Sequence, residues 1–147
     1  MKVIADELES ILRTADTLRL MDDRTVSIRP GPDKWSKKEI LGHLIDSASN
    51  NHQRFIRMQL VPRLELPGYQ QNEWVRIQHY QDRPWSEIVD LWHMYNVHLA
   101  TVIRHADPNS LRNKWRGPDG EDLDLEFVMR DYLVHMRHHL DQILPPQ

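Results

Sequence analysis

Residues 35–46, with the sequence WSKKEILGHLID, begin the helix around which the predicted fold is built. Ser36 followed three residues later by Glu39 is a capping-box pattern, and Trp35 before it can act as a hydrophobic staple. Apolar residues then recur at helical spacing until Pro62 ends the segment. They are Ile40, Leu41, Leu44, Ile45, Ala48, Phe55 and Ile56.

Three further segments show the same periodicity and place this helix in a bundle. They run from about residue 3 to 20, from Pro84 to Asp107, and from Leu125 to Leu144. The irregular connection over residues 63–83 is long for a compact domain, and a short helix near 72–78 fits within it. The sequence therefore predicts one all-α domain over residues 1–147, a four-helix bundle with a long crossover connection between helices 2 and 3.

Composition narrows the classes of function. The formal net charge is -3, so no general attraction to nucleic acid or to an anionic membrane is expected. No apolar run approaches the length of a membrane span, and the first residues carry acids where a signal peptide is apolar, so we expect a cytoplasmic protein. The chain has no cysteine, which leaves His, Asp and Glu as metal ligands and excludes a cysteine nucleophile.

The nine histidines include one group whose spacing suits a metal site. His135 and His139 are four residues apart and lie on the same face of the last predicted helix, whereas His138 points toward solvent. On the second helix, His43, Ser47 and Asn51 follow one border of the apolar face. A histidine pair together with one histidine from another helix can hold a divalent ion and leave a coordination position open.

The same residues also allow a structural interpretation, since histidines at the edge of a helix are often simply half-buried. Asp46 follows His43 by three residues and could orient its imidazole, or it could be an ordinary helix charge. The remaining histidines share no pattern and are predicted to be surface or structural residues; they are His52, His79, His93, His98 and His105. The five tryptophans are interpreted mainly as core and loop packing, although they could line a pocket.

Three ordered motifs resemble one known family. Residues 35–47 (WSKKEILGHLIDS) resemble the opening motif of the DinB-like superfamily of bacterial metalloproteins, and residues 132–143 (YLVHMRHHLDQI) resemble its closing motif. Residues 67–74 (PGYQQNEW) are similar to a loop of its YfiT-like metal-dependent hydrolases. The resemblance implies a four-helix bundle in which His43, His135 and His139 bind a divalent ion, usually zinc or nickel, with water completing the coordination.

The resemblance also implies a set of reactions. Some relatives transfer a low-molecular-weight thiol such as bacillithiol or mycothiol to electrophiles, another isomerises maleylpyruvate, and several are dimers. We therefore expect a metal-dependent enzyme that activates a small thiol cosubstrate or water for transfer to an electrophilic small molecule. The alternatives are a metal-dependent hydrolase and a non-catalytic helical module braced by metal. An exposed apolar helix face would permit a homodimer.

Overall fold

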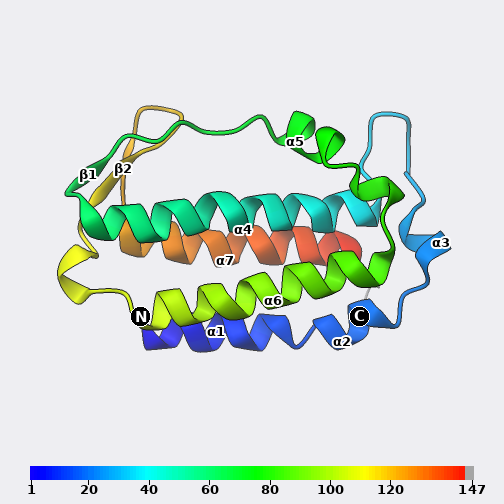
Figure 1. Cartoon of the computed structure of the whole chain (residues 1–147), viewed down its shortest axis with the longest axis horizontal. Helices are drawn as coiled ribbons and strands as arrows, with labels where there is room; N and C mark the ends of the chain where they lie inside the picture. The colour runs from blue at the N-terminus through cyan, green and yellow to red at the C-terminus, as the bar shows by residue number, and fades with distance from the viewer. Residues whose placement is uncertain (145–147) are drawn as a thin grey trace.

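The computed structural model describes residues 1–144, and four long helices packed side by side form its body (Figure 1). These helices are α1 (Lys2–Leu12), α4 (Lys37–Leu60), α6 (Trp85–Arg104) and α7 (Leu125–Ile143). Helix α4 packs against both α6 and α7, and α1 contacts the other side of α6 and α7, which closes the bundle. The predicted four-helix bundle is confirmed.

The capping box predicted from the sequence sets the start of α4. The Ser36 hydroxyl accepts a hydrogen bond from the Glu39 backbone N–H, and the Glu39 carboxylate accepts one from the Ser36 N–H at 2.9 Å. These bonds satisfy two of the backbone donors that a helix start leaves free. Arg29 forms an ion pair with the same carboxylate, so the loop before α4 is fixed to the helix start.

The first predicted helix is interrupted. The structure has α1, then a break at Arg13 and Thr14, and then α2 (Ala15–Arg19) instead of one helix over residues 3–20. The Thr14 hydroxyl donates to the Ile11 carbonyl at 2.8 Å, and such local bonds compete with the backbone ladder of a helix. A further short helix, α3 (Asp23–Val26), is capped by Asp22 and was not predicted.

The two long connections contain strands and 3-10 turns that the all-α prediction omits, together with a short helix close to the one predicted near 72–78. The connection between α4 and α6 holds β1 (Arg63–Leu64), α5 (Gln71–Ile77) and the 3-10 turn η1 (Tyr80–Asp82). The connection between α6 and α7 holds η2 (Pro108–Ser110), β2 (Lys114–Arg116) and β3 (Asp122–Asp124). Strand β2 pairs in parallel with β1 and antiparallel with β3, so a small sheet ties both connections together at one end of the bundle (Figure 1).

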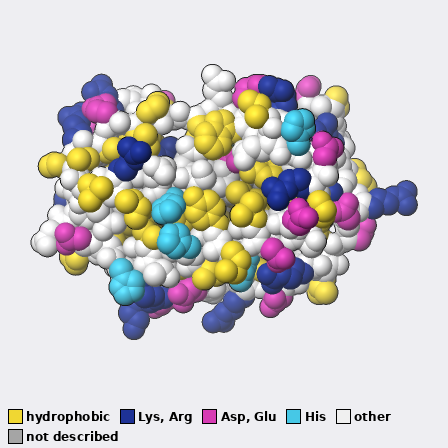
Figure 2. All heavy atoms as spheres, in the orientation of Figure 1, with side chains coloured by type: hydrophobic (Ala, Val, Ile, Leu, Met, Phe, Trp, Pro, Cys, Tyr) yellow, Lys and Arg dark blue, Asp and Glu magenta, His cyan; other side chains and the backbone are white. Residues whose placement is uncertain are grey.

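The core lies between the four long helices and is apolar. Trp92, Phe55 and Met58 are among its largest fully buried side chains. On the face drawn in Figure 2, positive and negative side chains lie intermixed, in keeping with the small net charge. Over residues 1–144, none of the helices combines the length and apolarity needed to cross a membrane.

Candidate metal centre

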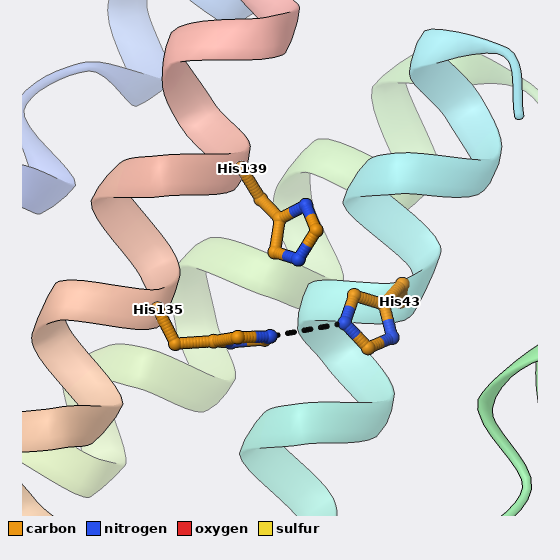
Figure 3. A group of neighbouring side chains, drawn as sticks. All are labelled: His43, His135 and His139. Atoms are coloured by element: carbon orange, nitrogen blue, oxygen red, sulfur yellow. Dashed lines mark hydrogen bonds between the residues drawn. The ribbon is translucent and has the colours of Figure 1, made fainter.

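Helices α4 and α7 bring the three predicted histidines together. His43 lies in the first half of α4, and His135 and His139 lie one turn apart on α7. The three rings point toward one another across the gap between the two helices (Figure 3). The predicted outward orientation of His138, the histidine between these two on α7, is also confirmed. His138 is exposed, and its Nε2 lies 3.0 Å from Gln142 Nε2.

The ring nitrogens converge on one small volume. His43 Nε2 lies 3.2 Å from His135 Nε2, and one ligand atom from each of the three residues can be chosen so that all lie within 4.8 Å of one another. The ring planes of His43 and His135 meet at 74°, and those of His43 and His139 meet at 75°. Two nitrogens bound to one tetrahedral zinc at about 2.05 Å would be about 3.3 Å apart, close to the separation seen here.

Burial keeps these imidazoles in the neutral form that binds metals. His43 is fully buried, and burial, followed by the charges of His135 and His139, lowers the pKa of His43 to about 3. Burial and the neighbouring His139 lower the pKa of His135 to about 4, and burial also lowers the pKa of His139. All three are therefore unprotonated at neutral pH, each with a nitrogen lone pair available to a cation.

The arrangement fits a divalent ion better than it fits a set of structural histidines. Two neutral imidazoles can meet through their Nε2 atoms only if one of them carries its proton there. A cation between them removes this requirement, because both lone pairs then point at it. The Nδ1 atoms of His43 and His139 are also buried and form no hydrogen bond with any group within residues 1–144. Three neutral nitrogen ligands suit zinc, nickel, copper or iron.

Two neighbouring side chains hold the rings in place. Ser47, one turn after His43 on α4, places its hydroxyl 3.5 Å from His135 Nδ1 and can accept a hydrogen bond from the Nδ1–H group. This bond would leave the lone pair of His135 on Nε2, which is the atom that faces His43. The indole of Trp35 lies 5.1 Å from the His43 ring between centroids and covers the side of that ring.

The suggested role of Asp46 is not observed. Its carboxylate accepts hydrogen bonds from the Tyr80 hydroxyl at 2.8 Å and from the Gln78 amide, and not from His43. Tyr80 reaches Asp46 by crossing α4 at Gly42, where an added Cβ would lie only 2.2 Å from the Tyr80 ring. Asp46 therefore fixes the crossover connection to α4 beside the cluster, because its partners come from that connection.

The other histidines lie outside the cluster. His79, His98 and His105 are exposed, and His52 and His93 are half-buried. His52 and His98 do meet, with ring centroids 5.0 Å apart, although no pattern in the sequence indicates their proximity. Among the tryptophans, Trp85 and Trp92 are core residues as predicted, whereas Trp35 covers His43.

Sequence reasoning placed Ser47 on the correct helix border but assigned it no role. The available signal was its spacing of four residues from His43, which puts both on one face of α4. Tyr80 gave no comparable signal, because it comes from the irregular crossover connection. Its contact with Asp46 depends on how that connection folds back across the helix.

Two known proteins are similar to this chain, one in sequence and one in structure. A curated protein of Halalkalibacterium halodurans, named "Putative metal-dependent hydrolase BH0277", is 23% identical over 112 residues, which are 74% of this chain and 63% of that protein. This chain thus matches less than two thirds of the length of that relative. The solved structure of YfiT from Bacillus subtilis, described as "a probable metal-dependent hydrolase with an unusual four-helix bundle topology", superposes with a TM-score of 0.76. It is 19% identical, and the match covers 95% of this chain and 81% of YfiT, which establishes a shared fold.

A family model gives the broadest match along the sequence. The model of the DinB superfamily matches residues 9–143, a range that includes α4, α7 and all three histidines of the cluster. With the bundle and the converging histidines, this match defines the family: the chain belongs to the DinB superfamily.

Proposed function

We propose that this protein is a metal-dependent enzyme that transfers a small thiol to an electrophilic small molecule. His43, His135 and His139 hold the divalent ion, and the convergence of their nitrogens is the observation that carries the proposal. When bound, such an ion supplies a Lewis acid that lowers the pKa of a thiol or water beside it. The names of the relatives from Halalkalibacterium halodurans and Bacillus subtilis support metal dependence.

The residues around the cluster position the ligands and exclude water. Ser47 orients His135, Trp35 covers His43, and the contact of Tyr80 with Asp46 fixes the crossover connection next to the cluster. A rigid set of ligands keeps the coordination geometry constant while substrates enter and leave. In the transfer itself the thiol loses its proton to solvent, its sulfur bonds to the electrophilic carbon, and the leaving group departs with its electron pair.

The absence of an evident general base favours a thiol over water. No carboxylate belongs to the histidine cluster within residues 1–144. The nearby Asp46 accepts from Tyr80 and Gln78 through Oδ1, its Oδ2 is buried without a hydrogen-bond partner there, and neither oxygen bonds to a histidine of the cluster. A free thiol has a pKa of about 8.5, whereas water, with a pKa of about 15.7, needs far more assistance to become a nucleophile. Because the chain has no cysteine, the thiol must come from a cosubstrate.

Hydrolysis is the second candidate, and the descriptions of both relatives favour it. One assay separates the two reactions. The zinc- or nickel-loaded protein is incubated with 1-chloro-2,4-dinitrobenzene and a panel of thiols that includes bacillithiol and mycothiol, and in parallel with p-nitrophenyl acetate without thiol. We expect thiol conjugation that is lost with a chelator and in His135→Ala, and retained in His52→Ala.

Ester hydrolysis that needs metal but no thiol would establish the hydrolase instead. A metal-loaded protein that turns over neither substrate class, and that chelation only destabilises, would contradict both enzymatic proposals. That result would leave an ion that braces the bundle.

A further inference from the structure

A pocket of about 360 Å³ opens beside the histidine cluster. Its wall includes one of the three histidines, His135, together with side chains from α4, α7 and the connection that carries β2. Apolar side chains, among them Leu123, Phe127 and Val128, form part of this wall. A small organic molecule in the pocket would therefore contact the centre at one end and apolar surface along its length.

Arg54 lines the same pocket and has no counter-ion. Arg54 is only 9% exposed, and no Asp or Glu within residues 1–144 forms an ion pair with it. Its Nη1 donates to Asn51 Oδ1 at 3.1 Å, its guanidinium lies 4.0 Å from the centroid of the Trp115 ring, and its Nε is buried without a partner. A buried charge without a counter-ion is costly, so an anion that enters the pocket beside Arg54 would be stabilised there.

Arg54 lies on the same face of α4 as His43 of the candidate metal centre. His43, Ser47, Asn51 and Arg54 follow one another at steps of four, four and three residues and so share one face of the helix. His43 and Arg54 are separated by eleven residues, a rise of about 16 Å. Ser47, Asn51, Arg54 and His135 all line the pocket, which thus extends along this face from the centre to the guanidinium.

We propose that the pocket binds an elongated small molecule with a carboxylate group at one end, and that Arg54 binds the carboxylate. Its other, reacting end then lies beside His135, which is the part of the inference that rests on the proposed function. The guanidinium lies over the Trp115 ring, and its planar fork of donors matches the geometry of a planar carboxylate. Asp119 and Asp131, exposed at the edge of the pocket, disfavour ligands with further negative charge.

The test compares hexanoate with hexanamide, which have the same length but differ in charge. Each is titrated into metal-free protein by isothermal titration calorimetry, and the indole N–H resonance of Trp115 is followed by NMR. We expect hexanoate to bind at least about tenfold more tightly than hexanamide, and to shift the Trp115 resonance, because a charge-assisted bond to Arg54 is worth at least that factor. Arg54→Gln should remove the preference and Arg54→Lys should keep part of it.

Arg57→Gln is the matched control, since Arg57 is exposed on the same helix and the substitution removes the same charge. It should leave the preference for hexanoate unchanged. Equal affinities for hexanoate and hexanamide in the wild type, or a preference that survives Arg54→Gln, would overturn the inference. Because the titration uses metal-free protein, failure of the metal site leaves its outcome unaffected, and failure of carboxylate binding leaves the metal site intact.

Discussion

Two groups of histidines pack ring against ring in this bundle, yet only one has the properties of a metal site. In the first group, His43, His135 and His139 converge from α4 and α7 with His43 fully buried. In the second, His52 and His98 meet between α4 and α6 with ring centroids 5.0 Å apart, but His98 is exposed. His52 turns its Nδ1 toward the Tyr95 hydroxyl at 3.2 Å.

The comparison indicates which features beyond the proximity of imidazole rings favour a metal site. The first group has three ligands, nitrogens that point at one volume, and burial that keeps the rings neutral. The second has two rings and no third ligand within the part of the chain that the structure describes. An open divalent site requires three protein ligands, so we expect a divalent ion at the first group and not at the second.

The largest expected effect is the stabilisation that metal gives to the folded state. At a free zinc or nickel concentration about 1,000 times the dissociation constant, binding adds about 4 kcal/mol, which raises Tm by about 10 °C in a chain of this size. Differential scanning calorimetry of metal-free and metal-loaded protein measures the shift. His135→Ala should abolish it, whereas His52→Ala should retain it, and a shift that is lost only in His52→Ala would reverse the assignment of the two groups.

The next effect concerns pH in the metal-free protein. Burial lowers the pKa of His43 to about 3 and that of His135 to about 4, below the ordinary value of 6.5, so the unfolded chain takes up protons first as pH falls. The contribution of these two neutral rings to the free energy of unfolding is therefore fully present above about pH 6.5. It is lost progressively as pH falls toward 3, by about 1.4 kcal/mol for each unit of pKa difference.

Urea unfolding between pH 7 and pH 4 measures this slope, and NMR titration identifies the residues responsible. His43→Gln should make the slope shallower. Titration of the His43 ring near pH 6.5 in the folded, metal-free protein would show that burial does not depress its pKa.

A smaller effect tests how the cluster is fixed to the crossover connection. Gly42→Ala places a methyl group 2.2 Å from the Tyr80 ring, so Tyr80 must move away from Asp46. Overpacking of this kind costs about 1–3 kcal/mol, which exceeds the gain in helix propensity of about 1 kcal/mol. Chemical denaturation measures the loss. Ser49→Ala, elsewhere on α4, is the control, and equal stabilities of the two variants would contradict the close approach of Tyr80.

The smallest expected effect is on zinc affinity and compares the hydroxyl beside His135 with the hydroxyl beside His52. Ser47→Ala removes the hydroxyl that faces His135 Nδ1 and should weaken zinc binding by about tenfold, the lower end of what such partners contribute. Tyr95→Phe removes the hydroxyl beside His52 and should leave zinc affinity unchanged. Competition with a chromogenic chelator measures both affinities. Equal effects of the two substitutions would show that Ser47 does not orient His135.

The sequence was informative where the contacts are local. The four helices, the capping box of Ser36 and Glu39, and the outward orientation of His138 all follow from spacing along one helix. The break at Thr14 was missed because a single hydroxyl bond decides it against a continuous apolar pattern.

Contacts between distant segments were beyond the reach of periodicity. The parallel pairing of β1 with β2 joins residues about fifty positions apart in the chain. The sequence left Asp46 as either a partner of His43 or an ordinary helix charge, whereas the folded chain buries it against Tyr80 and Gln78 of the crossover connection. Arg54 lacked any distinguishing signal, since only the folded chain shows that its charge is buried without a counter-ion.

The metal content of the purified protein tests the central claim most directly. The protein is prepared without an affinity tag, and its metals are counted by inductively coupled plasma mass spectrometry beside His43→Ala, His139→Ala and the control His52→Ala. We predict about one zinc or nickel per chain in the wild type and in His52→Ala, and almost none in the other two variants. A wild type that holds no metal and takes none up when metal is added back would contradict the assignment of these histidines as a metal centre.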